Sequence, residues 1–228
     1  MEVIVVDNGS ADSTLEDIRI WMEENGLDSG RIRIIEMGRN AGVAAGRNAG
    51  LKEACGDYLL LLDNDTIANP EAIEGCIYHL EETQGCGICA PALYSPQGEL
   101  QASAKPFPGL GIKLSHVAGH LLGFGKELKR ERGELAKKHP FYLIGAFQMF
   151  RREVYAAAGP LDEKIFYGPE DADFCMRVRA KGWSIDYLPQ YRLIHDWRRA
   201  TRRSPLSRLG RLHAAALLHF YIKHRRFR

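Results

Sequence analysis

Two carboxylates separated by one residue follow a strongly apolar stretch of the chain. Residues 59–62 are four leucines, and Asp63, Asn64 and Asp65 come directly after them. Charged side chains are rarely buried unless they pair or bind a cation. If the backbone stays extended, Asp63 and Asp65 project to the same side, where two oxygen donors suit Mg²⁺ or Mn²⁺ and leave positions for phosphate and water. The competing interpretation is a polar strand end that leads into a helix cap at residues 69–70.

A second acidic cluster lies in the last third of the chain. Residues 167–173 read YGPEDAD and offer three carboxylates in four positions, at Glu170, Asp171 and Asp173. A positioned carboxylate can act as a general base, which contributes about 10²–10⁴-fold to a rate. Pro169 favours the first turn of a helix, where acidic side chains complement the helix dipole. The same pattern is therefore also typical of a helix start without a catalytic role.

Alternating strand and helix signals must position these two clusters. Continuous apolar or β-branched runs predict buried strands over residues 2–6, 33–36 and 57–62. Helices are predicted after a capping box at Ser13, over 41–53, from Pro70, near 153–158 and over 170–181. This alternation predicts an α/β fold with a mostly parallel sheet and helices on both faces. Ligands of such sheets collect beyond the carboxyl ends of the strands.

The remaining segments carry weaker signals. Residues 92–140 are rich in Gly, Pro and Lys and predict a flexible insert with weak strand signals near Gln101 and Ile112. Short strands are expected near Ile185 and Leu193. Cys86 and Cys89 form a C-x-x-C pair, but the sequence shows no second pair for zinc, and we interpret both as small buried residues. Five irregularly spaced cysteines indicate a reducing compartment.

Charge is distributed unevenly along the chain. Ten of the 31 Lys and Arg residues, and no acidic residue, lie in residues 197–228, which leaves 21 basic and 29 acidic residues before them. We therefore divide the chain into a catalytic or binding domain, residues 1–197, and a basic amphipathic C-terminal helix within residues 198–228. Basic residues beside an apolar helix face are typical of a helix that lies on an anionic membrane surface. The alternative is a helix that docks on the domain with its charges in water. No nucleic-acid motif accompanies them.

Several motifs, taken in order, resemble the family 2 glycosyltransferases. They are VIVVDNGSADST, RNAGVAAGRNAGL, GDYLLLLDND, the long segment from IGAFQMFRREVY to GPEDADFCMRVRAKGW, and YLPQYRLIHDW, which together span nearly all of residues 2–197. The resemblance is greatest to bacterial rhamnosyltransferase-type members that build surface polysaccharides. It implies the GT-A fold, a single Rossmann-like nucleotide-binding domain. Family members usually begin with one more strand and helix, so the chain is expected to lack that first unit.

The resemblance implies a nucleotide and metal site. Asp7 matches the acid that recognises the base, Asp63 the acid near the ribose and Asp65 the one that holds the metal, Mn²⁺ or Mg²⁺, on the diphosphate. His195 matches a position that completes the metal site or touches the diphosphate. Arg47 and Asn48 match positions that line the nucleotide pocket, although both are equally compatible with a solvated helix surface.

The resemblance also implies an acceptor side. Asp171 matches the catalytic base and Glu170 an acceptor or orienting contact, whereas Asp173 is expected to be structural. The helix N-terminus is expected to help keep Asp171 ionised. Gly145, Ala146 and Phe147 match the stretch beneath the donor sugar, and ordinary close packing is the alternative.

Together these features predict an inverting, divalent-metal-dependent glycosyltransferase. It would move a sugar from a dTDP- or UDP-linked donor to a hydroxyl on a saccharide or lipid-linked acceptor, in bacterial surface polysaccharide synthesis. No leader or membrane span is visible in the sequence, which predicts a cytoplasmic protein that is peripheral on the inner membrane face. The alternatives are a catalytically impaired nucleotide-sugar-binding module and a sugar nucleotidyltransferase.

Overall fold

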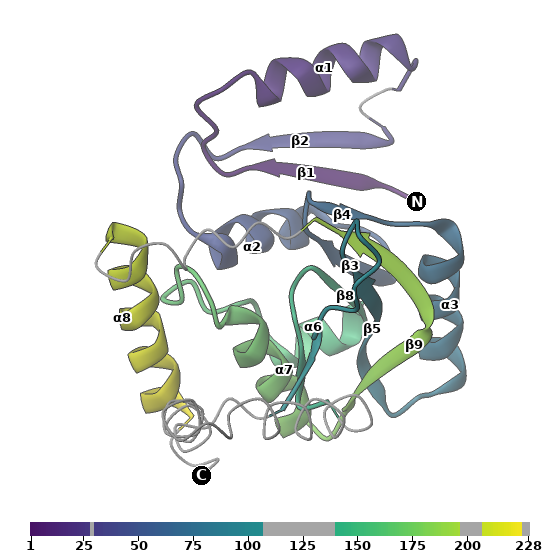
Figure 1. Ribbon diagram of the computed structural model, residues 1–228, viewed down its shortest axis with the longest axis vertical. Helices are drawn as coiled ribbons and strands as arrows, with labels where there is room; N and C mark the ends of the chain where they lie inside the picture. The colour runs from purple at the N-terminus through teal and green to yellow at the C-terminus, as the bar shows by residue number, and fades with distance from the viewer. Residues whose placement is uncertain (28–29, 107–139, 197–206, 225–228) are drawn as a thin grey trace.

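The computed structural model describes residues 1–27, 30–106, 140–196 and 207–224 (Figure 1). Its strands are β1 (Val3–Asp7), β2 (Ile32–Glu36), β3 (Tyr58–Leu62), β4 (Thr66–Ile67), β5 (Cys86–Tyr94), β6 (Ala104–Lys105), β7 (Tyr142–Leu143), β8 (Phe147–Arg151) and β9 (Ser184–His195). Its helices are α1 (Thr14–Glu24), α2 (Val43–Glu53), α3 (Pro70–Glu82), α6 (Arg152–Ala158), α7 (Glu170–Ala180) and α8 (Arg208–Lys223).

The central sheet has five strands in the order β3-β8-β5-β9-β4. Only β5 and β9 pair in parallel within it, because β8 runs antiparallel between β3 and β5 and the short β4 runs antiparallel beside β9. The predicted α/β class is confirmed. The expectation of a mostly parallel sheet is wrong, because β8, which follows the long segment after β5, enters the sheet in the reverse direction.

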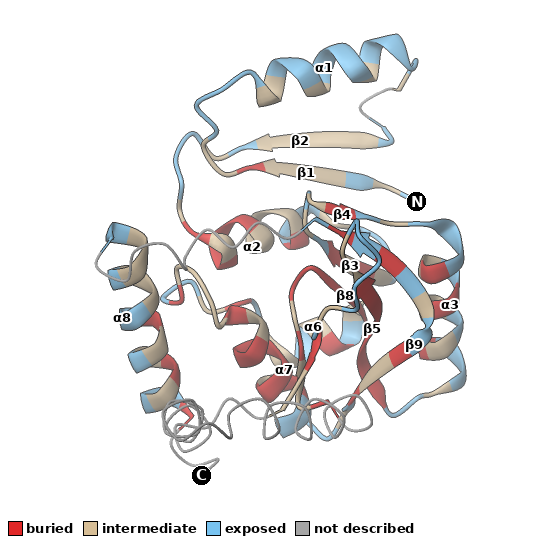
Figure 2. Cartoon of the chain, in the orientation of Figure 1, coloured by how far each residue is buried: buried red, intermediate tan, exposed pale blue. Residues whose placement is uncertain are grey.

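Helices cover both faces of the central sheet. A side chain added at Gly87 of β5 would meet Val178 of α7, whereas the Cys89 thiol contacts the carbonyl oxygen of Cys76 in α3 at 3.6 Å. The aromatic core lies on the α7 side, where the rings of Phe150 and Phe174 are 5.1 Å apart. Figure 2 shows buried residues concentrated in this sheet and in α7. The run predicted at residues 57–62 therefore forms β3, and its Leu59 and Leu61 are buried in the core.

The N-terminal part forms a separate layer. β1 and β2 pair in parallel with each other and form no described ladder with the central sheet; α1 packs above them (Figure 1). α1 has no buried residue, and Val3 is 41% exposed. The prediction that residues 2–6 form a strand is confirmed, but the prediction that this strand is buried is wrong for the described residues.

Local signals were confirmed in part. Asn69 caps α3 by accepting a hydrogen bond from Ala72 N at 2.8 Å, as its position before Pro70 predicts. Ser13 is the N-cap of α1 but its hydroxyl donates to Asp17 instead, so the predicted capping box does not form. The two short strands expected near Ile185 and Leu193 are one strand, β9.

Part of the predicted insert lies within the described residues. Its first residues continue β5 as far as Tyr94, and Ala104–Lys105 of β6 pairs with Tyr142–Leu143 of β7. The expected strand near Ile112 lies outside the described residues. So do the RRATRR segment and the last four residues of the basic tail. None of the described helices has the length and apolarity that crossing a bilayer requires.

The C-terminal helix α8 packs against α7. Ala216 and Phe220 join a small apolar cluster with Met176 of α7. Asp173 of α7 is fully buried and accepts hydrogen bonds from His224 and Arg177, at 2.7 and 2.9 Å, while Lys223 lies 2.7 Å from it. Although burial opposes the charge, the hydrogen bonds from His224 and Lys223 and the charge of Arg177 lower the pKa of Asp173. The prediction that Asp173 is structural matches these contacts.

We expect Asp173→Asn to lower the free energy of unfolding by about 3 kcal/mol at pH 7, because it removes one partner from a buried ion-pair network. The folded-state pKa is lowered, so the stabilisation is present above the unfolded pKa of about 3.9 and is lost as pH falls further. The difference between the variant and the wild type should therefore shrink below about pH 4. Urea titrations at several pH values measure it, and the exposed Glu24→Gln is the control. A variant as stable as wild type at pH 7 would contradict the structural role.

Candidate functional site

A tight turn gathers the first acidic cluster at the end of β3. Thr66 N donates to Asp63 O at 3.0 Å, so residues 63–66 form a turn and not the extended segment that we expected. The strand β4 that follows pairs with β9 in a register that sets Thr66 opposite His195. Oxygen atoms of Asp63 and Asp65 and a ring nitrogen of His195 then lie within 4.8 Å of one another.

The side chains of this cluster suit a divalent cation. Asp65 Oδ1 is buried and accepts no hydrogen bond from the described residues, and it lies 3.3 Å from His195 Nε2. The other ring nitrogen, Nδ1, lies 2.6 Å from Gln101 Oε1, and Gln101 Nε2 donates to the His195 carbonyl at 2.7 Å. If Nδ1 carries the proton, Nε2 is left as an acceptor that faces Asp65. Two carboxylates and one imidazole nitrogen are ligands that Mn²⁺ and Mg²⁺ accept.

Arg47 links Asp63, in the cluster with Asp65 and His195, to Glu170 in the second acidic cluster. Its side chain is 12% exposed, and it lies 2.7 Å from Asp63 Oδ1 and 3.0 Å from Glu170 Oε1. Burial opposes its charge, but Asp63 and Glu170 outweigh this and raise the pKa of the guanidinium. The alternative that Arg47 solvates a helix surface is therefore wrong. The guanidinium is fixed between β3 and α7.

Gly145 joins the same network through its backbone. Its carbonyl oxygen accepts from Arg47 Nη2 at 3.0 Å, and its N–H donates to Asp171 Oδ2 at 3.3 Å. A side chain added at Gly145 would come 2.3 Å from Arg47 Nη1, which is closer than any real contact. A larger residue would push the Arg47 guanidinium away from Asp63 and Glu170, so glycine at this position lets the backbone lie against both acidic clusters.

The Asp171 carboxyl is positioned but not kept ionised. Burial raises its pKa to about 7, and the nearby Glu170 charge adds to this shift, although the N–H of Ala172 and the charge of Arg47 oppose it. The helix N-terminus does favour the ionised form, as expected, because the Ala172 N–H lowers the pKa, but burial outweighs this contribution. A carboxyl that titrates near neutral pH is well matched to proton transfer.

Glu170 is held by Arg47 and by a backbone group that the sequence did not single out. Its carboxylate accepts from Gly168 N at 2.7 Å as well as from Arg47. His213 of α8 lies on the other side of this loop, with Nδ1 2.9 Å from Tyr167 O. Neither His213 nor Gln101 had a recognisable signal in the sequence, because both act through partners more than 40 residues away. The C-terminal helix therefore supports the loop that begins α7.

Three predicted site residues are occupied elsewhere. The Asp7 carboxylate accepts from Gly9 N and Ser10 N in its own turn, which lowers its pKa together with the Ser10 side chain. The Asn48 amide bonds to Leu161 and Glu163, in the loop after α6. Phe147 is fully buried in the core opposite Leu62. The structure does not bring these three side chains into the network around Arg47.

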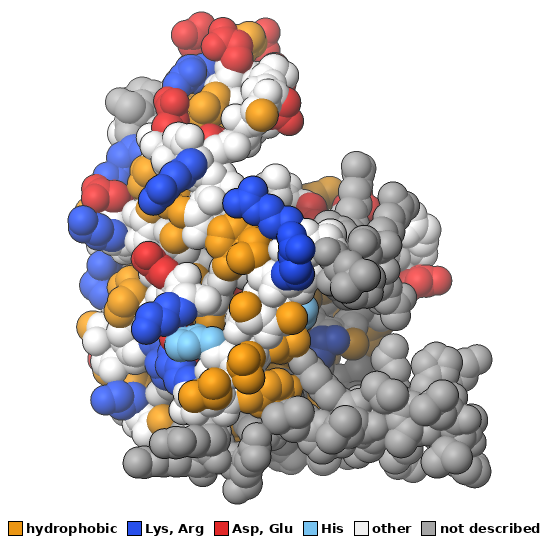
Figure 3. Space-filling view, turned by 90° about the vertical axis from the view of Figure 1, so that its left-hand side faces the viewer, with side chains coloured by type: hydrophobic (Ala, Val, Ile, Leu, Met, Phe, Trp, Pro, Cys, Tyr) orange, Lys and Arg blue, Asp and Glu red, His pale blue; other side chains and the backbone are white. Residues whose placement is uncertain are grey.

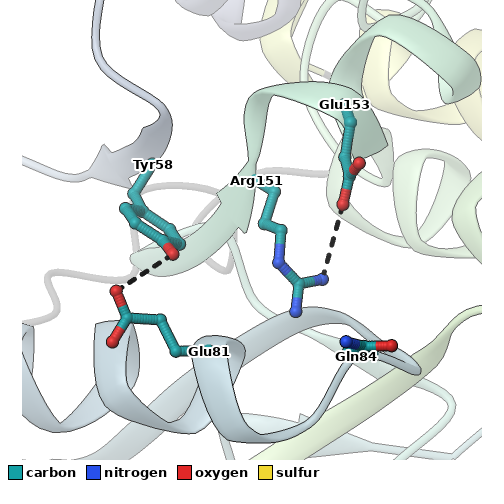
Figure 4. A pocket seen from close by; sticks show the side chains of 5 residues that line it. All are labelled: Tyr58, Glu81, Gln84, Arg151 and Glu153. Atoms are coloured by element: carbon teal, nitrogen blue, oxygen red, sulfur yellow. Dashed lines mark hydrogen bonds and ion pairs between the residues drawn. The ribbon is translucent and has the colours of Figure 1, made fainter.

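An open pocket lies at the other end of β3 (Figure 4). Tyr58, Glu81, Gln84, Arg151 and Glu153 line it. The Tyr58 hydroxyl donates to Glu81 at 3.2 Å, and Arg151 donates to three carbonyl groups at the end of α3 and the start of β5. Its polar side chains serve the packing of α3, and none of the predicted site residues lines it.

Comparison with known proteins identifies the family. A family model described as "Glycosyl transferase family 2" matches residues 1–158, which is more than half of the chain. An N-acetylglucosaminyl-diphospho-decaprenol L-rhamnosyltransferase of Mycobacterium tuberculosis is 24% identical over 98% of this chain and 76% of its own length. A dTDP-rhamnosyl transferase of Shigella flexneri is 22% identical over 85% of the chain and 59% of its own length.

Solved structures show the same fold. The mannosyltransferase of Pyrobaculum calidifontis in complex with GDP-Man and Mn²⁺ superposes with a TM-score of 0.64 at 17% identity, over 99% of this chain. GalNAc-T7 with UDP, GalNAc and Mn²⁺ gives the same TM-score at 15% identity over 91% of the chain. The chain spans 55% and 40% of these two proteins. Both are glycosyltransferases of GT-A architecture, and the predicted fold is confirmed. The chain is therefore a rhamnosyltransferase-like glycosyltransferase that belongs to glycosyl transferase family 2.

Proposed function

We propose that this chain transfers a sugar, with inversion, from a dTDP- or UDP-linked donor to a hydroxyl of a saccharide or lipid-linked acceptor. The observation that carries the proposal is the buried Asp65 Oδ1, which accepts no hydrogen bond within the described part of the chain. It faces His195 and is joined through Asp63 and Arg47 to the second acidic cluster. The network thus combines a place for a donor diphosphate with a carboxyl suited to remove a proton. The rhamnosyltransferase relatives support a deoxyhexose as the sugar.

A divalent cation held by Asp65 and His195, with Asp63 beside them, would neutralise the charge that develops on the leaving diphosphate. The Mn²⁺ named with two neighbouring structures supports Mn²⁺ or Mg²⁺ as this ion. Arg47 fixes Asp63 at 2.7 Å, so the carboxylate is preoriented toward the donor. The Gly145 backbone lies between Arg47, on the side proposed for the sugar nucleotide, and Asp171, on the side proposed for the acceptor. A side chain at this position would clash with Arg47.

Asp171 takes the proton from the acceptor hydroxyl as the glycosidic bond forms. Its Oδ2 accepts from Gly145 N and its Oδ1 from Ala172 N at 2.7 Å, so two backbone groups hold the carboxyl in one orientation. Glu170 orients the loop before α7 through Gly168 N and Arg47. A base with a pKa near 7 keeps enough ionised form at neutral pH and still binds the proton that it removes.

We expect dTDP- or UDP-sugars to bind in the presence of Mn²⁺ or Mg²⁺, and Asp65→Asn to weaken this binding by more than about 100-fold. The loss of an outer-shell partner of a metal ligand typically costs about 10–100-fold, and Asp65 would contact the metal directly. Calorimetric titration with and without chelator measures it. Asp57→Asn, an exposed acid at the opposite end of β3, is the matched control and should bind as wild type.

The same panel separates the alternatives. Metal-dependent binding without turnover on any saccharide or lipid-linked acceptor would indicate a nucleotide-sugar-binding module. Release of pyrophosphate from a nucleoside triphosphate and a sugar phosphate would indicate a nucleotidyltransferase. If no sugar nucleotide binds with metal, the proposed function fails.

We expect Asp171→Asn to reduce kcat by about 10²–10⁴-fold with donor affinity retained, because general base catalysis is lost and donor contacts are not. In wild type, kcat/KM should fall about tenfold per unit as pH decreases below about 7, since only the ionised carboxyl accepts the proton. Steady-state rates between pH 5 and 9 measure both effects.

A stability measurement is the control for this variant. The pKa of Asp171 is raised in the folded state, so its ionisation lowers the free energy of unfolding as pH rises above about 3.9. Asp171→Asn should therefore be no less stable than wild type at pH 8. Loss of donor binding with unchanged turnover of bound donor would rule out the base assignment.

We also infer that α8 contacts an anionic membrane surface near a lipid-linked acceptor. Its outward face carries Arg208, Arg211, Leu218 and Ile222, and the two apolar side chains are 63% and 58% exposed. Figure 3 shows apolar side chains gathered in the region of α8 and bordered by basic ones. Apolar and basic groups on one helix face favour binding in the plane of an anionic interface.

We expect the protein to sediment with vesicles that contain anionic lipid and not with neutral vesicles. The double variant Arg208→Gln, Arg211→Gln should weaken this binding by about 20–30-fold, since each charge contributes about 1 kcal/mol near such a surface. Arg31→Gln, Arg39→Gln, two exposed charges distant in sequence from α8, serves as the control. Equal binding to neutral vesicles would contradict the electrostatic contribution, and no binding at all would contradict the membrane contact.

A further inference from the structure

Three elements bring sulfur, nitrogen and oxygen ligand atoms together on the α3 side of the central sheet. This group is separate from the cluster of Asp63, Asp65 and His195. His79 of α3, Cys86 of β5 and Asp186 of β9 offer one ligand atom each, and these atoms lie within 4.8 Å of one another. His79 Nε2 is 2.8 Å from Asp186 Oδ2. The ligand atoms of a tetrahedral zinc ion, at about 2.0–2.3 Å from the metal, lie about 3.3–3.8 Å apart, so shifts of about 1 Å or less separate this arrangement from a bound state.

An irregularity in β5 creates the cluster. Cys86 pairs with Ser184 and Ile88 with Ile185, so Gly87 is an extra residue without a partner. In a regular strand, Cys86 and Cys89 would point to opposite faces, because side chains alternate. The extra residue turns both toward α3. The sequence argued against zinc because it shows no second Cys pair beside Cys86 and Cys89. In the structure, His79 and Asp186 provide the further ligand atoms.

Further thiols surround the cluster. Cys76 is one helical turn before His79, and Cys76, Cys86 and Cys89 are all fully buried. The side chains of Cys76 and Cys86, together with burial, raise the pKa of the Cys89 thiol, so the three sulfur groups lie close together. His79 and Asp186 are each 26% exposed, which leaves the cluster a route to solvent.

We propose that His79, Cys86 and Asp186 bind a Zn²⁺ ion, with water as the fourth ligand. Neither the family assignment nor the glycosyl transfer chemistry requires this site. Zinc favours thiolate and imidazole ligands and accepts a carboxylate. On binding, the Cys86 thiol loses its proton to solvent and the sulfur becomes a thiolate ligand. Ser184 Oγ donates to Asp186 Oδ1 at 2.8 Å and would hold the carboxylate in place.

Cobalt titration of the reduced, chelator-treated full chain tests the site. We expect one equivalent of Co²⁺ to produce an intense near-ultraviolet sulfur-to-cobalt charge-transfer band, and one equivalent of Zn²⁺ to remove it. The cluster of Asp63, Asp65 and His195 contains no sulfur, so Asp65→Asn should leave the charge-transfer band unchanged. This makes failure of the zinc site distinguishable from failure of the proposed transferase function.

Variants identify the ligands. Cys86→Ser should abolish the band, and His79→Ala, at a partly exposed position, should weaken cobalt binding without opening the core. Ser184→Ala should weaken it by about 10-fold, as losing a partner of a metal ligand does. Cys175→Ser, a buried cysteine in α7, and Cys55→Ser, an exposed one, are the matched controls and should retain the band.

Two outcomes would overturn the proposal. One is the absence of a charge-transfer band in folded, fully reduced wild-type protein, with folding verified by circular dichroism. The other is a band that persists in both Cys86→Ser and His79→Ala. Either result would leave His79 and Asp186 as an ordinary ion pair beside buried thiols.

Discussion

The site depends on one buried cation. Asp63, Glu170 and Asp171 come from segments far apart in sequence, and three carboxyl groups crowded in a half-buried space would otherwise repel one another. Taking a charge out of water costs several kcal/mol, and an opposite charge with good geometry offsets this cost. Arg47 provides that charge and bonds to Asp63, Glu170 and the Gly145 carbonyl. Since α2 carries Arg47, this helix sets how closely the end of β3 can approach the start of α7.

Much of the site could be predicted because its residues follow strong local signals. Asp63 and Asp65 follow a run of leucines, and Glu170 and Asp171 begin a helix after Pro169, so both segments were assigned with their elements. The turn at residues 63–66 could not be predicted, since the expectation rested on an extended backbone. The raised pKa of Asp171 was also missed. The position of this residue at a helix start can be read from the sequence, but the burial that raises its pKa is known only from the packed structure.

Long-range partners account for most other differences. The mixed pairing of the central sheet arises from β8, which no local pattern could place between β3 and β5. Gln101 and His213 gain their roles from His195 and Tyr167, and Cys86 gains its neighbours from an extra residue in β5. In each case the residue type was visible, but its partner was not. Asp7 and Asn48 show the converse, since a motif match did not reveal that other hydrogen bonds already engage their side chains, within its own turn for Asp7 and to residues 161 and 163 for Asn48.

The continuity of β9 has a consequence for the fidelity of folding. Near its start, Ser184 N donates to Gly85 O and Asp186 meets His79; at its end, Thr66 pairs with His195. A slip of one residue along a neighbouring strand would send every side chain of β9 to the opposite face. His195 would then point away from Asp65, while the backbone ladder could still form. Contacts at the start of β9 therefore help to set the register that brings His195 to Asp65 at its end.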